Sequence, residues 1–240
     1  MSSFLALSAL AVLTVSDPVD ATFASNEHHQ FSAQEMERIG ERLAVIHARV
    51  ATDFPHLDDR VNVSVVPVNR PVLDALGGVT GRADQVDQVL IEMSVTFPGG
   101  MDAASEAGLD ATFAHELHHT ARGWLINGNH YGYGIQIAAI NEGLATVYAE
   151  ELLGTVNPSD LPPEDVEAWA LEILALPQAS DYGHWMFSHP DGREAIGYRT
   201  GRWVVRRAMA RSGLSIIELS DMTPEAIWRL AGYDWDRALR

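Results

Sequence analysis

Cysteine and lysine are both missing from this chain of 240 residues. Without cysteine the chain forms no disulfide and no cysteine-ligated structural zinc site, so any metal ion must be held by His, Asp or Glu side chains. That ligand set is more typical of an open catalytic metal site than of a closed structural one.

Positive charge is scarce as well. The 16 basic residues, all arginine, stand against 33 acidic ones, and the formal net charge is −17. A surface this acidic repels phosphate backbones and anionic membrane surfaces, so we expect no nucleic-acid partner. The acidity has two interpretations: a preference for basic substrates, or solubility alone. Solubility is the simpler of the two.

Long hydrophobic runs are also missing. The longest, Phe4 to Val15, is interrupted by Ser8, and it is too short for a bilayer, which takes about 20 residues. We therefore expect no membrane span. Because no basic residue precedes the run, a normal secretory signal peptide is disfavoured, and we interpret Ala11–Ser16 as a first β-strand. The expected location is cytoplasmic, with secretion by an atypical signal peptide as the alternative.

The pattern of the chain changes near residue 100. Before it we expect a helix from Phe31 to Ala51, opened by a capping box of Ser32 and Glu35, and strands at Arg60–Val68 and Gln88–Phe97. After it we expect helices at Met101–Ile126, Ile137–Leu153, Pro162–Leu176, Ile196–Arg211 and from Thr223. No linker separates the parts, so we expect one domain over 1–240, with an α/β lobe (1–100) and a mainly helical lobe (101–240).

One of these expected helices contains a metal-binding motif. Residues 114–120 read A-H-E-L-H-H-T, so His115, Glu116 and His119 form the pattern H-E-x-x-H. Residues four apart share one face of a helix, which lets both imidazoles reach one ion, while Glu116 lies about 100° round the helix and can address a water at that ion. A buried apolar stripe that includes Phe113 and Trp124 is expected on the other side. The alternative is a histidine-rich, solvated helix face.

A zinc site needs a third protein ligand, and Glu142 is the candidate. It lies in the run I-N-E-G-L-A-T, and its neighbours three and four positions away are small, which permits two helices to pack closely. A lone carboxylate buried there would be costly, and a metal ion on the facing helix removes that cost. The alternative is an ordinary ion pair between Glu142 and Arg122.

The other histidines are weaker candidates. An extended metzincin pattern fails, because Arg122 and Leu125 occupy the places of its glycine and last histidine. His118 is expected to be an outer neighbour of the site or exposed. Three histidines in loops remain open as ligands: His130, His184 and His189.

At these residues the chain resembles the bacterial zinc-dependent proteases grouped as domain of unknown function 2268, and more broadly the gluzincins. The matching pieces are A-H-E-L-H-H at 114–119, N-E-G-L-A at 141–145 and G-Y-R-T-G at 197–201. The resemblance implies that His115, His119 and Glu142 bind one zinc ion per chain and that Glu116 is the general base. It also implies an α+β, zincin-like fold with a small twisted sheet, an active-site helix and a helical C-terminal lobe.

Further side chains have two interpretations each. Tyr198 and Arg199 begin a later helix, where either would stabilise the oxyanion of a tetrahedral intermediate, or serve as a core tyrosine and a surface arginine. The loop Asn127–Gln136 contacts substrate or merely connects two helices. The strand Gln88–Phe97 pairs with an extended substrate or is an ordinary sheet strand. Residues Trp185–Phe187 are expected in the core, with a specificity pocket as the alternative.

The expected reaction is metal-assisted hydrolysis of a peptide or protein substrate, in which Glu116 takes a proton from water and passes it to the leaving amine. The rival is a non-catalytic, zinc-stabilised binding or regulatory protein on the same scaffold. Loss of the base would identify the rival, and Glu116 is present. The sequence does not indicate an oligomeric state.

Overall fold

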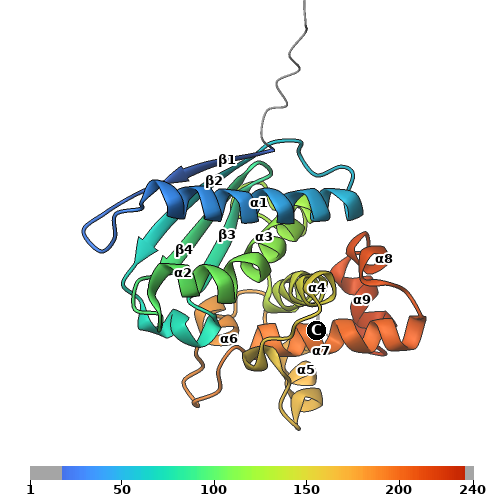
Figure 1. The fold of residues 1–240 in the computed structure, drawn as a ribbon. Helices are drawn as coiled ribbons and strands as arrows, with labels where there is room; N and C mark the ends of the chain where they lie inside the picture. Colours follow the sequence, from blue (N-terminus) through green and yellow to red (C-terminus); the bar gives the residue numbers. More distant parts are fainter. Residues whose placement is uncertain (1–17, 236–240) are drawn as a thin grey trace, which may run out of the picture.

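The computed structural model describes residues 18–235. The strand expected at Ala11–Ser16 lies outside them. Within the described part, no helix is both long and apolar enough to cross a membrane. Figure 1 shows a sheet and its covering helices in one half of the molecule and a group of helices in the other.

A four-stranded mixed sheet forms the first half, in the order β1 (Val19–Phe23), β2 (Val61–Val68), β4 (Gln88–Ser94) and β3 (Val79–Gln85). The first three are parallel, with Val19 opposite Val61 and Asn62 opposite Gln88. The last, β3, runs antiparallel to β4 and forms one edge of the sheet. Alternate residues of β2 are buried, as expected for a strand with one covered face. The expected α+β class is confirmed.

Helix α1 (Ala33–Asp53) covers the sheet and packs against α3, which carries the H-E-x-x-H motif (Figure 1). The capping box is confirmed, because the Ser32 hydroxyl accepts from the Glu35 amide and the Glu35 carboxylate accepts from the Ser32 amide. Ile39, Leu43 and Ile46 recur at helical spacing and are buried. This helix therefore seals the core from one side.

The motif helix is interrupted. In place of one helix from Met101 to Ile126 the structure has α2 (Gly100–Ala104), a π-helical turn η2 (Ser105–Leu109) and α3 (Asp110–Arg122). The helix stops because Gly123 adopts a left-handed φ of 78°. In the π turn, a Cβ added to Gly108 would lie 2.7 Å from the carbonyl oxygen of Gly77, so the chain leading into β3 packs directly on this turn.

The second half is helical and is built around α4 (Ile135–Leu153), which is buried along most of its length. The other elements are η3 (Pro158–Asp160), α5 (Val166–Leu174), α6 (Tyr182–Met186), α7 (Ile196–Ser212), α8 (Ile216–Ser220) and α9 (Pro224–Leu230). Helices α4 and α7 approach very closely at Gly143 and Gly201, where an added Cβ would overlap the facing backbone. The glycines of N-E-G-L-A and G-Y-R-T-G thus make this packing.

The edge strand β3 is the main element that the sequence patterns miss, together with β1, the 3-10 turn η1 (Pro71–Leu76), α6 and α8. Its sequence, VTGRADQ, contains few of the β-branched and aromatic residues that are typical of a strand. The two small residues Gly81 and Ala83 lie where the strand meets α3. The strand is therefore held by its neighbours rather than by its own propensity.

Candidate metal centre

Two histidines of α3 and one glutamate of α4 converge on a single point. The Nε2 atoms of His115 and His119 each lie 3.1 Å from Oε2 of Glu142. The two rings are edge to face, with centroids 4.5 Å apart. Within residues 18–235, these three side chains form a group in which one potential metal-ligand atom from each lies within 4.8 Å of the other two.

Glu142 is oriented from a second side by Trp124, whose indole Nε1 donates to its Oε1 at 2.9 Å. The expectation that Trp124 lies on the opposite, buried stripe is wrong, because the chain reverses at Gly123 and returns the indole toward α4. The alternative ion pair with Arg122 is also wrong. The guanidinium of Arg122 donates instead to Asn141 and to the backbone oxygens of Ser220 and Met222.

The remaining histidines lie elsewhere. His118 was expected to be either an outer neighbour of the site or exposed, and the second alternative is wrong, because it is fully buried; its Nε2 contacts the Ser220 hydroxyl at 2.8 Å. His130 lies against Gly123, where an added Cβ would meet its ring. His184 lies in α6, not in a loop as expected, and pairs with Asp181, whereas His189 pairs with Asp191. None of the four belongs to the converging group.

The charges in this cluster are strongly coupled. Burial raises the pKa of Glu142, but the contacts with His119 and His115 outweigh it and hold the pKa of this carboxyl far below its usual range. Burial lowers the pKa of His115, but its hydrogen bond to Glu142 and the charge of Glu116 outweigh it and leave the pKa raised. In the protein without metal, these shifts favour a proton on the His115 imidazole beside an ionised Glu142 carboxylate.

The donor set fits a zinc ion. Two ligand atoms about 2.1 Å from a tetrahedrally bound zinc lie roughly 3.4 Å apart, and the observed nitrogen–oxygen separations are 3.1 Å. Two imidazoles and one carboxylate leave a fourth position open, as catalytic zinc sites do. The Nδ1 of His119 has no hydrogen-bond partner within the described residues, so packing and the Nε2 contact hold this ring.

Glu116 lies beside the cluster and against the edge strand. It is 5% exposed, and burial raises its pKa, partly opposed by the two motif histidines and by a hydrogen bond from the backbone of Ala83. An added Cβ on Gly81 would lie 2.7 Å from Cγ of Glu116 and 3.0 Å from its Oε1. A glycine is therefore needed where β3 passes this carboxylate.

A cleft with a volume of about 720 Å³ opens over the motif and is lined by His115, Glu116, Tyr198 and Arg199. One wall is formed by η1 and the start of β3, and the other by residues 155–160 and the segment from Met186 to Arg199. The volume is within the range of about 300–1,000 Å³ typical of ligand sites. Both Tyr198 and Arg199 are thus brought to the same cleft as the motif.

Tyr198 and Arg199 differ in what they contact. Tyr198 is partly buried and lies close enough to Glu142 for the charge of that carboxylate to add to the effect of burial, which raises the pKa of the tyrosine hydroxyl well above its usual value. The guanidinium of Arg199 donates to the Leu161 carbonyl at 2.7 Å and lies over the ring of Trp169. Tyr198 therefore faces the metal-type donors, whereas Arg199 is turned toward α5 and the preceding loop.

The structure distinguishes among the other segments that were considered as substrate contacts. Strand β4 is paired on both sides, by β2 and β3, so the segment Gln88–Phe97 presents no free strand edge to a substrate. The loop residues His130, Tyr131 and Tyr133 do not line the cleft. In the core prediction, Met186 is buried as expected, but Phe187 is exposed and lines the cleft.

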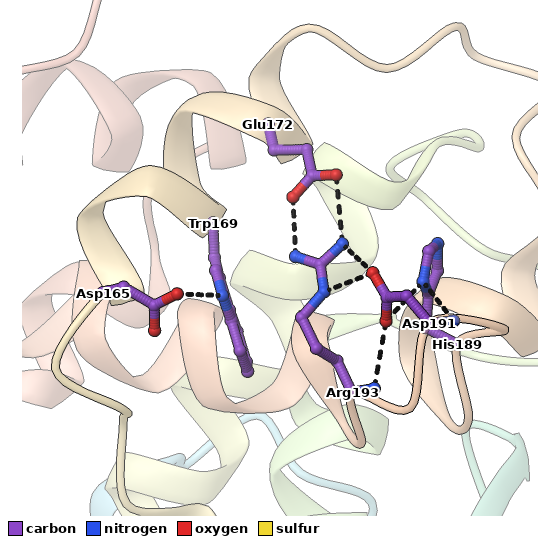
Figure 2. A network of polar contacts seen from close by, with 6 residues as sticks. All are labelled: Asp165, Trp169, Glu172, His189, Asp191 and Arg193. Atoms are coloured by element: carbon purple, nitrogen blue, oxygen red, sulfur yellow. Dashed lines mark hydrogen bonds and ion pairs between the residues drawn. The ribbon is translucent and has the colours of Figure 1, made fainter.

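The segment that presents Phe187 is fixed by the network in Figure 2. Arg193 pairs with Glu172 of α5 at 2.6 Å and with Asp191 at 2.8 Å. His189 contacts the same Asp191 carboxylate at 2.8 Å. These contacts tie the turn between α6 and α7 to α5, so this wall of the cleft is held in place by charged pairs.

Three site features escaped the sequence patterns: Gly81, the contact of Trp124 with Glu142, and Tyr182. The Tyr182 side chain lies close enough to Glu142 and Glu116 for their charges to add to the effect of burial, which raises its pKa. An isolated aromatic residue or glycine has no local pattern that marks it for a site. Only their positions around the motif reveal them.

A family model described as "Predicted Zn-dependent protease (DUF2268)" matches residues 54–229 of the chain. The match covers the whole of α3, α4 and α7, and so includes every residue of the converging group. No curated protein and no solved structure matches the chain.

Proposed function

We propose that this chain, which belongs to the family of predicted Zn-dependent proteases (domain of unknown function 2268), is a zinc metallopeptidase that hydrolyses peptide bonds with Glu116 as general base. The observation that supports it best is the convergence of His115, His119 and Glu142 next to a separate, buried carboxylate in a cleft. A purely structural zinc site would have no use for that fourth side chain.

His115, His119 and Glu142 would hold one zinc ion per chain. When bound, zinc supplies a Lewis acid that brings the pKa of a water near 7 and polarises a carbonyl oxygen. Trp124 holds the Glu142 carboxylate in place through Oε1, which leaves Oε2 to the metal position. The ligand spacing, a pair of histidines followed by a glutamate on the next long helix, is that of gluzincins.

Glu116 would take a proton from the attacking water and later deliver it to the leaving amine, so one carboxylate serves both transfers. Burial raises its pKa, which brings a carboxylate closer to the range in which it both accepts and returns a proton. Its position is set by the backbone of β3, which contacts it at Gly81 and Ala83.

Tyr198 is the preferred donor to the oxyanion, because its hydroxyl already lies at the metal-type donors. Arg199 is the second candidate, and it would have to leave the Leu161 carbonyl to take part. The outer edge of β3 lines the cleft at residues 79–81, where it would offer backbone groups to an extended peptide. Beyond this point the backbone oxygens of Ala83 and Asp84 already accept hydrogen bonds from Ile126 and Asn127. We propose that the chain is a single zincin-like domain of two lobes, 1–100 and 101–240; the cleft is lined by residues of both.

The test is Glu116→Gln. Glutamine keeps the shape and can still hydrogen-bond, but it accepts no proton at neutral pH. We expect full zinc content and an unchanged melting temperature, with hydrolysis reduced by about 10²–10⁴-fold or more. Zinc analysis and a turnover assay on a peptide library are run on one preparation, with chelator-treated wild type as control. Undiminished turnover in the zinc-loaded variant would reject Glu116 as the general base. Absence of turnover in zinc-loaded wild type would reject the peptidase proposal in favour of a zinc-stabilised binding protein.

A further inference from the structure

The cleft is bordered by large apolar side chains that are exposed to solvent. Val72 and Leu76 of η1 are 70% and 41% exposed on one wall, and Val156 and Phe187 are 47% and 56% exposed on the other. Single exposed apolar residues are ordinary, but a group of them around one cavity marks a binding surface. Something apolar is expected to cover these four side chains.

The floor of the cleft is free of bulky side chains. Ala107 and Ala111 are exposed along the helix that leads to His115, and Gly108 and Ala149 also line the cavity. The space above them is therefore left open rather than filled by the protein. Ala107, Ala111 and His115 follow one another at intervals of four residues, and all three line the cleft. The open space therefore adjoins the proposed reaction centre.

The charged groups of the cleft are largely partnered from within the protein. Glu150 is paired with Arg202 at 2.6 Å and with Arg206 at 2.9 Å. Glu194 accepts a hydrogen bond from the Ser188 hydroxyl at 2.8 Å. Apart from Glu116 of the motif, the remaining lining carboxylate is Asp160, which like Glu194 forms no ion pair within the described residues and accepts a hydrogen bond from Ser159. These two carboxylates support the competing expectation, a basic substrate.

We infer that the cleft selects peptides that carry a large apolar side chain, such as leucine or phenylalanine, next to the bond that is cut. The apolar rim, the open floor and the shared boundary with His115 all point to this occupant, and they outweigh the carboxylates of the cleft that lack an ion pair. The inference rests on the proposed peptidase function, because only that function makes a peptide the occupant of the cleft.

The experiment uses zinc-loaded wild type for turnover and zinc-loaded Glu116→Gln for binding. The probes are fluorescein-labelled peptides of glycine, serine and alanine in which one central residue is leucine, phenylalanine, alanine or arginine. We expect leucine and phenylalanine peptides to be cleaved and bound roughly 10–200-fold better than the alanine peptide. Binding is measured by fluorescence anisotropy, and this measurement gives a result even if no peptide is cut.

Two pairs of exposed positions serve as variants and matched controls. Val72→Asp, in the cleft, is compared with Val45→Asp on α1, and Phe187→Ser is compared with Tyr133→Ser. Because all four side chains are mostly exposed, their replacement leaves the fold intact. We expect the cleft variants to lose most of the preference for apolar peptides and the controls to keep it.

The outcomes separate the two proposals. Equal binding and cleavage of the leucine and alanine peptides would overturn the apolar inference and leave the peptidase intact. Tightest binding of the arginine peptide, abolished by Asp160→Asn, would overturn it in favour of charge recognition. Selective binding of apolar peptides without any cleavage by zinc-loaded wild type would reject the peptidase and retain the apolar site.

Discussion

Two buried glutamates on α4 have opposite surroundings. Glu142 and Glu150 are 5% and 7% exposed and lie on the same long helix. Glu142 faces α3, where it contacts two imidazoles and an indole. Glu150 faces α7, where two guanidinium groups, from Arg202 and Arg206, contact it. The helix thus carries one carboxylate toward the H-E-x-x-H motif and another toward arginines.

The difference shows which of the two needs an additional ion. Arginine stays charged at every relevant pH, so Glu150 is neutralised by the protein itself. His115 and His119, in contrast, bring no permanent positive charge, and both direct Nε2 at the same oxygen of Glu142. Two imidazole nitrogens that converge on one carboxylate oxygen form the donor set of a metal ion, which is why we interpret Glu142, and not Glu150, as a ligand.

The largest effect is expected when each of these two glutamates is replaced by alanine and the two variants are compared. Glu142→Ala should empty the zinc site and abolish hydrolysis. Glu150→Ala should retain zinc and lose about 3 kcal/mol of stability, because two arginines lose their partner and one of them is partly exposed. Zinc analysis and denaturant unfolding on both variants test the comparison. Stoichiometric zinc of wild-type affinity in Glu142→Ala would mean that the third ligand is another residue.

A smaller effect is expected from Tyr198→Phe, which removes the hydroxyl that faces Glu142. An oxyanion donor acts mainly in the transition state, so kcat should fall about 10²-fold while KM changes little. Tyr133→Phe, at an exposed position outside the cleft, is the control. Zinc content is measured alongside, because Tyr198 also touches a ligand. An unaltered kcat would make Tyr198 a packing residue.

Gly81→Ala disturbs the same centre from the side of the sheet, without touching either glutamate of α4. The new methyl would press on Cγ of Glu116, so the base must shift by a few tenths of an ångström or more. We expect kcat to fall on the order of 10²-fold with zinc retained, since misplacing a catalytic group is costly. Gly40→Ala, where nothing lies within 4 Å, is the matched control and should leave kcat unchanged.

The smallest effect is a pH dependence that differs in sign between the protein with and without zinc. The pKa of His115 is raised in the folded, metal-free protein, so its contribution to stability is complete below pH ~6.5 and is lost as the pH rises through the raised value. Lowering the pH from 8 to 6.5 should therefore stabilise the metal-free protein. Below that window burial opposes protonation of His118, whose pKa is lowered, and the trend reverses.

The zinc-loaded protein should behave in the opposite way, because protons compete with zinc for the imidazoles. Zinc affinity and activity should decline as the pH falls, and activity should be largely lost toward pH 5. Thermal unfolding and zinc titration at pH 8, 7 and 6.5 measure both trends. His115→Ala should abolish the stabilisation of the metal-free form. Parallel trends for the two forms would contradict the assignment of His115 as a shared proton and metal site.

Local patterns predicted the elements whose own residues specify them. The capping box of α1, the alternation of β2 and the helical spacing of α4 and α7 all appear within about a residue or two of the expected bounds. Strand β3 was missed because a glycine and an alanine replace the residues that normally mark a strand. Gly81 is required for the close approach to Glu116, a residue distant in sequence.

The sequence by itself determined that His115 and His119 share one helix face and that Glu116 lies beside them, because the repeat of an α-helix sets these relations. It also determined that no cysteine takes part. The tertiary structure alone decided that Trp124, rather than Arg122, contacts Glu142, and that the edge strand holds the base. Such contacts join separate elements, and they depend on how closely backbones pack, as at Gly143 and Gly201, which no local repeat records.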